Sequence, residues 1–397
     1  MLDLAARRGV SESGAGTAQT AAGMSEAGAL IRLTAVATPP WRRLSDRAAE
    51  PNAYYLPDWE LAVNASAPGR TGSSVLCASS PPSSARLIGL LPVIPLRRAF
   101  RIPLPALASA HPYGTLCTPL IDRDMADDAA AQLLQQARNT GARALLLREL
   151  ALDGAVLAAF TASARREGLR PRVLCSHVRA CLDATRDGEE LLREALGGRK
   201  LKELRRQRHR LAEHGAVRFT VARTPRDVAA ALEIFLRLES SGWKGQRGTA
   251  LLQVEGDATF IRRAAVALAE ADQCEIVTLR AGDTPVAAGI VLRHQDRAFF
   301  FKLGVDERFA KFSPGVQLTL DLTRHLCADP GITSADSTAS PDHPMINPIW
   351  RGRFAIGDVL IPLRRRDPVV ALIQAALVAR QSALELARWA VHFVRGR

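Results

Sequence analysis

The stretch Gly304–Leu320 reads GVDERFAKFSPGVQLTL and joins an apolar run to a segment that the sequence predicts to be a helix. Ser313 suits the N-cap position, where its hydroxyl accepts an amide hydrogen bond. Pro314 suits the first helical position, which needs no amide donor. The amides that follow would then lack partners within the helix, namely those of Gly315, Val316 and Gln317.

A helix N-terminus with open amides suits an anionic group, because the partial positive charge of the helix adds to the amide donors. Gly315 would let a ligand approach the backbone closely, and two cations precede it in the sequence. We therefore predict a diphosphate site at Arg308, Lys311, Ser313, Gly315, Val316 and Gln317. An ordinary capped helix that binds nothing is the alternative.

The segment after Pro314 also carries a conflicting signal. Val316, Leu318 and Leu320 alternate with polar residues, and a period of two is typical of a strand. The Ser-Pro start and the unbroken length to Cys327 favour a helix, and we predict a helix on that basis.

Regular elements flank this stretch on both sides. The second half of the chain predicts strands at 217–222, 275–280, 286–293, 298–304, 332–336 and 355–362, and helices at 225–239 and 258–271. The first half predicts strands at 74–78, 86–95 and 144–150, and helices at 127–138 and 155–167. Both halves therefore predict an α/β (α+β) fold with mixed sheets flanked by helices.

The formal net charge is +13, but only one segment concentrates it. Residues 199–210 carry seven Lys or Arg with leucines at helical spacing, which predicts a basic helix between the two halves. Its leucines would dock it on the fold while its cations stay in solvent; alternatively, the cations contact a phosphate-rich partner such as transfer RNA, a nucleotide-linked sugar or a membrane surface. No aromatic residues are interleaved with the charges, so sequence-specific recognition of nucleic acid gains no support.

Six cysteines include no C-x-x-C pair, which argues against a zinc ribbon or a redox dithiol and favours a reducing, cytoplasmic compartment. There is no Walker A loop, zinc helix or nucleophile elbow. We expect a disordered leader at 1–29 and no stretch long enough to span a membrane. The tail at 367–397 predicts a long helix that packs on the domain or on a second subunit, or that lies on a membrane surface.

Four segments together resemble the acetyltransferase domain of the GNAT superfamily: KLKELRRQRHRLAEHG, LESSGWKGQRGTAL, FFFKLGVDERFAKFSPGVQL and ADSTASPDHPMINPIW. More specifically, they are similar to proteins of the CelD/BcsL type, which are associated with bacterial cellulose and exopolysaccharide biosynthesis and are distantly related to Fem-type aminoacyltransferases. The resemblance implies tandem GNAT-like domains, with a degenerate copy at 30–185, a basic linker helix at 186–216, the acetyltransferase domain at 217–366 and a C-terminal helix at 367–397.

The resemblance also implies a cofactor and a reaction. The cofactor would be acetyl-CoA or another acyl-CoA, and the acceptor an amine or hydroxyl of a small molecule or saccharide precursor. Two departures from the GNAT pattern stand out: the positions of the pyrophosphate signature fall on Ala310, Ser313 and Gly315, and the tyrosine that often protonates the leaving thiolate is missing from the second half, because Tyr54, Tyr55 and Tyr113 all lie in the first.

Direct acyl transfer needs a base near the thioester, and several side chains are candidates. Glu239 precedes a Gly-rich loop and Asp336 ends a strand, while Asp342 and His343 lie in a nearby loop. Each has a structural alternative: an ion pair for Glu239, a turn bond for Asp336 and a structural hydrogen bond for His343. We expect substrate contacts from Trp243, Lys244 and Asp342, although Trp243 also suits a packing role.

The resemblance, together with these residues, implies three alternative functions. The first is acyl-CoA-dependent transfer. The second is Fem-like transfer from aminoacyl-tRNA, which the basic helix would serve. The third is a non-catalytic scaffold of a polysaccharide synthase, peripheral to the inner membrane, with the C-terminal helix as a possible oligomer contact.

Overall fold

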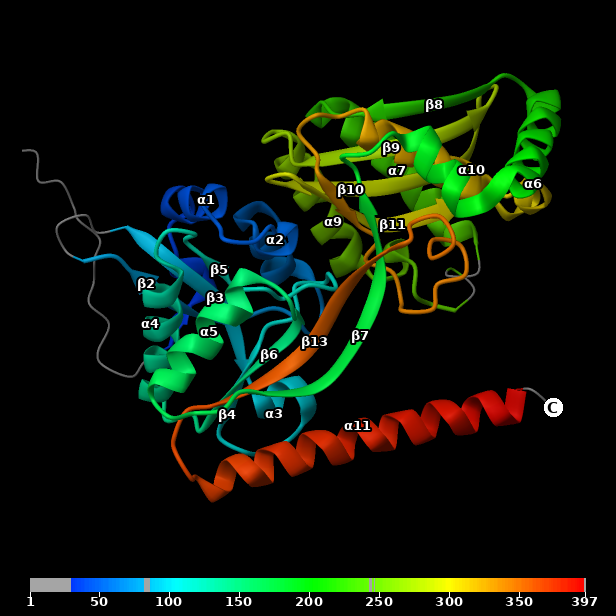
Figure 1. Ribbon diagram of the computed structural model, residues 1–397. Coiled ribbons are helices and arrows are strands. Elements are labelled where there is room, and N and C mark those ends of the chain that lie inside the picture. The colour runs from blue at the N-terminus through cyan, green and yellow to red at the C-terminus, as the bar shows by residue number, and fades with distance from the viewer. Residues whose placement is uncertain (1–29, 82–85, 243–244, 246, 396–397) are drawn as a thin grey trace, which may run out of the picture.

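The computed structural model describes residues 30–81, 86–242, 245 and 247–395. The expected leader at 1–29, together with Trp243 and Lys244, lies outside the described residues. The described part of the chain forms a mixed sheet whose strands run in the order β1-β2-β3-β4-β6-β13-β7-β12-β11-β10-β9-β8, with β5 (Leu120–Ile121) paired to β3. Helices flank this sheet, and the predicted fold class is confirmed (Figure 1).

The strands of the main path contain both predicted and unpredicted elements. Their bounds are β1 Ile31–Arg32, β2 Ser74–Ser79, β3 Leu87–Pro95, β4 Ala106–Ser109, β6 Ala144–Ala151, β7 Arg172–Asp183, β8 Val217–Ala222, β9 Cys274–Ala281, β10 Thr284–His294, β11 Arg297–Val305, β12 Ser334–Asp336 and β13 Gly352–Pro362. The long strand β7 was not predicted, because its polar and apolar residues follow no clear period.

The sheet joins the two halves of the chain through strands that are distant in sequence. β13 is the last strand in the chain, yet it pairs antiparallel with both β6 and β7. β7 in turn pairs with β12, which runs parallel to β11. β7 and β13 therefore run side by side between the two lobes (Figure 1). The predicted domain boundaries at 185 and 217 stay a prediction, because strands from either side of them are hydrogen-bonded to one another in the same sheet.

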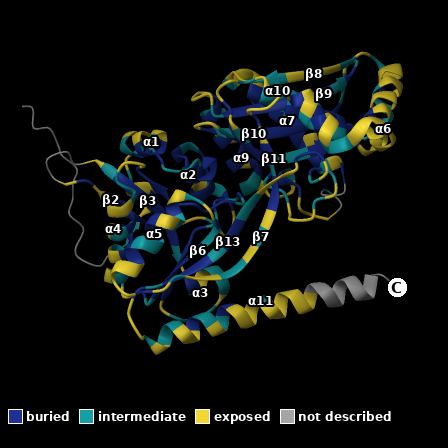
Figure 2. Ribbon diagram, viewed as in Figure 1, coloured by how far each residue is buried: buried dark blue, intermediate teal, exposed yellow. Residues whose placement is uncertain are grey.

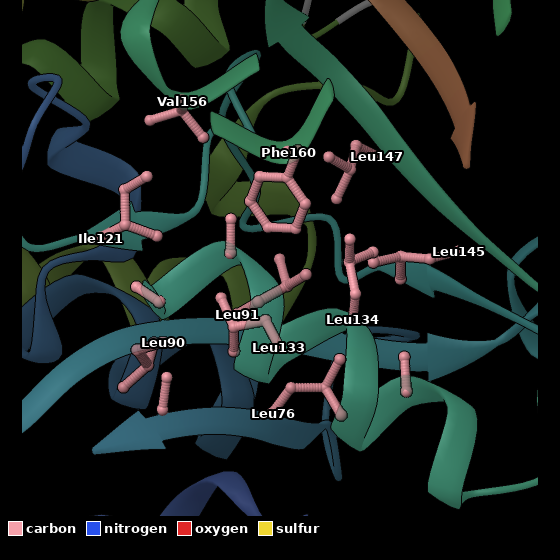
Figure 3. Packing of buried hydrophobic residues seen from close by; sticks show 14 of the residues in the cluster. Leu76, Leu90, Leu91, Ile121, Leu133, Leu134, Leu145, Leu147, Val156 and Phe160 are labelled. Carbon is pink, nitrogen blue, oxygen red and sulfur yellow. The ribbon is translucent and has the colours of Figure 1, made fainter. Parts of the chain in front are cut away.

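The longer helices cover the sheet in each half. They are α1 Thr38–Asp46, α2 Pro57–Ser66, α4 Ala126–Asn139, α5 Ala155–Arg166, α6 Gly188–Leu211, α7 Pro225–Ser241, α9 Glu255–Ala269, α10 Pro314–Cys327 and α11 Pro368–Arg395. In the first half, α4 and α5 bury Leu133, Leu134 and Phe160 against β3 and β6 (Figure 3). In the second half, α7 and α9 cover one face of β9–β11, and α10 packs on the other with α6 beside it.

The quoted stretch does continue into a helix, α10, as predicted. The period of two arises because the intervening polar residues are also buried and hydrogen-bonded. Gln317 Nε2 donates to Leu204 O at 2.8 Å, and Thr319 Oγ1 donates to Gly315 O at 2.8 Å. Nearly the whole circumference of the helix is therefore interior, which removes the usual polar face.

The expectation that no stretch is long enough to span a membrane is wrong, because one helical segment has the necessary length and composition. Within α11, residues Pro368–Ala387 are long and apolar enough to cross a bilayer, and little of this segment is buried in the protein. The basic helix is confirmed as the C-terminal part of α6, which changes direction at Gly197, whose φ of 68° is left-handed.

A buried ion pair ties β7 to β12 where the two halves meet. Arg179 Nε donates to Asp336 Oδ1 at 2.7 Å, Nη2 donates to Oδ2, and Nη1 donates to Thr115 O at 2.7 Å. Both side chains are 1% exposed. Removing one partner leaves a charge without compensation in the interior, and this costs far more than breaking an exposed pair.

We predict that Arg179→Met lowers the free energy of unfolding by about 3–5 kcal/mol, because Asp336 would remain buried without its cation. Urea denaturation would measure the loss. The matched control is Arg42→Met, which breaks the pair between Arg42, 53% exposed, and Asp58 and should cost less than about 1 kcal/mol. Equal losses in the two variants would contradict the assigned role of the buried pair.

Candidate functional site

A cavity of about 480 Å³ opens where the parallel strands β11 and β12 diverge. Their pairing ends at Phe299 and Asp336. Beyond this point β11 continues to Val305, while the chain after β12 turns away through Thr338, whose φ is 51°. Thr338 Oγ1 donates to Phe300 O at 2.7 Å and holds the start of the divergence. The cavity is thus a consequence of the sheet topology.

The lining combines one strand, the 3₁₀ turn that follows it, one helix N-terminus and one loop. Most of it is apolar, and the charged or titratable members are Lys302, Glu307 and His343. The other lining residues are Phe300, Phe301, Leu303, Val305, Ala310, Ser313, Pro314, Gly315, Val316, Ser337, Thr338, Ala339, Met345 and Ile346. An apolar cavity of this volume with a few polar groups has the usual character of a small-molecule site.

The N-terminus of α10 forms one end of the cavity. The expectation that Ser313 caps the helix through its hydroxyl is wrong: Ser313 closes the preceding 3₁₀ turn at φ 53°, ψ 53°, and its side chain caps nothing. The amide of Gln317 donates to Ser313 O at 3.0 Å, so it is not open either. Within the described residues, no hydrogen-bond acceptor is recorded for the amides of Gly315 and Val316, and both residues line the cavity.

Gly315 allows the start of α10 to pack closely against β11 and against Met345 in the loop after β12. A Cβ built at this position would lie 3.1 Å from Leu303 Cδ2, 3.2 Å from Val305 Cγ1 and 3.3 Å from Met345 Sδ. These distances are tighter than ordinary contacts, so a larger side chain would have to displace Leu303, Val305 and Met345, which line the cavity. The requirement for Gly here is steric, because its φ is not left-handed.

The two cations expected to accompany these amides lie elsewhere. Arg308 pairs with Asp306 at 2.7 Å, and its side chain is 80% exposed. Arg308 and Lys311 line a separate hollow with His214 and Phe309. The predicted placement of Arg308 and Lys311 beside the open amides is therefore wrong, because the 3₁₀ turn Glu307–Phe312 directs them to another surface.

Lys302 supplies the cation that lines the cavity, and the sequence reasoning missed it. Its Nζ lies 3.0 Å from Glu239 Oε1, and the carboxylate also accepts a hydrogen bond from the Leu251 amide at 3.0 Å. A lone Lys within the apolar run FFFKLG was the signal that could have identified it. α7 reaches β11 closely at Gly304, where a Cβ would meet the Glu239 amide nitrogen at 2.9 Å.

The predicted bases separate into three environments. Glu239 is fully buried behind Lys302 and does not line the cavity. Asp336 is engaged by Arg179 and also accepts a hydrogen bond from the Thr338 amide at 2.8 Å, so its carboxylate is committed to structure rather than presented to a substrate. The turn bond considered for Asp336 is thus present. Asp342 is exposed and outside the lining.

His343 is the predicted catalytic residue that lines the cavity. It is half-buried, and its Nδ1 accepts a hydrogen bond from the Met345 amide at 3.3 Å. In this arrangement the neutral ring carries its proton on Nε2. The tyrosines do not replace it: Tyr54, Tyr55 and Tyr113 are absent from the lining. Burial raises the pKa of Tyr54 and Tyr113 well above the usual value.

Comparisons with known proteins agree with this geometry. Residues 198–343 match the family model described as an acetyltransferase (GNAT) domain, so this segment is similar to GNAT-type acetyltransferases. No match is found among curated proteins.

Three solved structures share the fold over most of this chain. The C-terminal domain of a putative lysylphosphatidylglycerol synthetase from Agrobacterium fabrum has 14% identity and a TM-score of 0.51, covering 86% of this chain and 96% of its own. FemX has 12% identity and a TM-score of 0.54, covering 85% and 98%. A conserved protein of unknown function from Bacteroides thetaiotaomicron has 12% identity and a TM-score of 0.53, covering 85% and 100%. Identities this low show a common fold alone.

We predict that Lys302 and Glu239 are energetically coupled by at least about 1 kcal/mol, because removing either partner leaves the other charge poorly compensated in a buried place. Lys302→Met and Glu239→Gln should each destabilise the protein, and the double variant should lose less than the sum of the two. A double-mutant cycle by urea denaturation measures the coupling. Additive losses would show that the two side chains do not act as a pair.

Proposed function

We propose that the protein is an acyl-CoA-dependent N- or O-acyltransferase that acetylates an amine or hydroxyl of a small molecule or saccharide precursor. The observation that carries the proposal is the cavity between diverging parallel strands, which ends at the open amides of Gly315 and Val316. We place the reaction in the cytoplasm. A role in cellulose or exopolysaccharide biosynthesis is part of the proposal and rests on the sequence resemblance.

The residues present fit an acyl-CoA. The amides of Gly315 and Val316 at the N-terminus of α10 would hold a diphosphate oxygen. The apolar lining, including Phe301 and Leu303, suits the uncharged arm and the acyl group. The bound thioester supplies an activated acyl group whose thiolate, with a pKa of about 8.5 for an ordinary thiol, is a tolerable leaving group.

The chain's own side chains divide the remaining work. Lys302 places a positive charge beside an apolar cavity, where it would stabilise negative charge that develops during acyl transfer. Glu239 acts through Lys302 as a positioning residue, because its carboxylate does not reach the cavity. We assign proton transfer to His343: its basic atom is Nδ1, which would exchange the 3.3 Å hydrogen bond from the Met345 amide for the proton of the acceptor amine or hydroxyl and then pass that proton to the departing thiolate.

We predict that acetyl-CoA and free CoA raise the melting temperature of the intact protein in a thermal-shift measurement, because a ligand that binds only the folded state stabilises it. Gly315→Val should lose this shift, since the new side chain would displace Leu303, Val305 and Met345 and change the shape of the cavity. Gly198→Val is the matched control: a Cβ there meets nothing within 4 Å, and the shift should persist. Absence of any shift for the unaltered protein at saturating ligand would count against acyl-CoA and favour the non-catalytic scaffold.

A second candidate, transfer from aminoacyl-tRNA, has its own supporting observation. Arg205 and Arg206 on α6 are exposed, and neither has an acidic partner recorded in the described part of the chain. The fold shared with FemX is consistent with this candidate but does not establish it.

The tRNA candidate predicts that transfer RNA binds with an affinity that falls steeply with salt. Replacing Arg205, Arg206 and Arg208 with Ala should weaken binding by about tenfold or more, because each lost phosphate contact removes counterion release. Filter binding over a salt series measures both effects. The control replaces Arg97, Arg98 and Arg101, which lie in the other half of the chain; an equal loss in both triple variants would indicate attraction to net charge alone.

A further inference from the structure

The helix α11 has one face that the protein covers. Ile373 is fully buried and Leu377 is 8% exposed, and both join a cluster formed by Leu96, Ala106, Ala108, Ala144, Leu146 and Leu360. The first half of the helix is therefore anchored to the first lobe and runs beneath β4 and β6 (Figure 1). Because these contacts belong to the hydrophobic core, this part of α11 cannot enter a bilayer end-on without breaking them.

The opposite face of α11 is apolar and exposed. Leu372 is 56% exposed, Val378 44% and Leu386 67%. Ala371, Ala375 and Ala379 are also exposed and continue the stripe at helical spacing. From Pro368 to Leu384 the sequence of the helix contains one charged residue, Arg380. Figure 2 shows α11 exposed along much of its length, and no described residue covers this outward face.

A cluster of cations lies at the start of this face. Six exposed arginines line two adjoining hollows next to the first turns of α11: Arg165, Arg170, Arg172, Arg364, Arg365 and Arg366. Among the described residues no ion pair is recorded for any of the six. Val173, 55% exposed, lies among them on β7. We refer to these six residues as the arginine cluster.

We propose that the outward face of α11 and the arginine cluster dock together on the surface of a bilayer that contains anionic phospholipids. The arginines contact lipid phosphates, and the apolar stripe lies in the boundary between headgroups and acyl chains, with the helix parallel to the membrane plane. This inference is independent of acyl transfer. It specifies the surface and the lipid chemistry for the peripheral association expected from the sequence.

The charges favour a membrane over a second copy of the chain. An apolar stripe alone would suit either partner. The arginine cluster, however, requires anions, and a second α11 offers no acidic residue before Glu385. Pairing two chains with a formal charge of +13 each also brings like charges together. An anionic bilayer satisfies both the apolar stripe and the adjacent cations.

Flotation of the full chain with lipid vesicles tests the proposal. We expect binding to vesicles of phosphatidylcholine mixed with phosphatidylglycerol, and little binding to phosphatidylcholine alone. Arg364→Glu, Arg365→Glu and Arg366→Glu combined should weaken binding by at least about tenfold, since each basic residue near an anionic surface contributes to affinity. Leu372→Ser, Val378→Ser and Leu386→Ser combined should also abolish flotation, because the apolar stripe is lost.

The matched control reverses three charges elsewhere. Arg218→Glu, Arg226→Glu and Arg263→Glu, at exposed positions in the second half of the chain, change the net charge equally and should leave flotation within about twofold of the unaltered protein. An equal loss in this control would overturn the proposal. So would a failure of the unaltered protein to float. Sedimentation of the same proteins without lipid tests whether a second copy of the chain covers the stripe. If the unaltered protein is a dimer that does not bind vesicles, and the serine variant is a monomer, the stripe is an interface between two copies.

Discussion

The Arg179–Asp336 ion pair is the constraint on which the candidate site depends. It connects β7, from the first half of the chain, to the end of β12, at the point where β12 stops pairing with β11. Asp336 then holds the Thr338 amide, and Thr338 holds Phe300 O. A continuous set of hydrogen bonds therefore runs from the junction of the halves to the wall of the cavity. The charge pair sets the place where the two strands diverge.

The divergence explains how an apolar cavity acquires its few polar groups. Lys302 lies on the part of β11 that extends beyond its pairing with β12. Glu239 on α7 supplies the carboxylate that pairs with Lys302 from outside the cavity. α10 begins beside this strand and directs two backbone amides into the same space. A charge from a side chain and partial charges from a helix are thereby placed in surroundings of low polarity, where electrostatic interactions are stronger than in water.

The sequence predicted much of this arrangement, for reasons that can be traced to particular residues. The Ser-Pro-Gly run marked the start of α10, and the apolar runs around 275–304 marked β9, β10 and β11 within one or two residues of their ends. Strand β7 was missed because neither face of it is uniformly buried. Glu239, Asp336 and His343 were all selected from the sequence, but only the fold distinguishes a residue behind the cavity, one in a structural ion pair and one in the lining.

Local chemistry within the sequence determined the elements and the glycine at the helix end, because turn residues and hydrophobic periodicity act over a few positions. The tertiary structure alone decided which side chains share a site. The pairings that built it, Lys302 with Glu239, Arg179 with Asp336 and β13 between β6 and β7, join residues 63, 157 and about 200 positions apart. Such contacts depend on sheet order and register, which no short segment encodes. Likewise, only the tertiary structure decides which face of α11 is buried against the first lobe and which face is exposed.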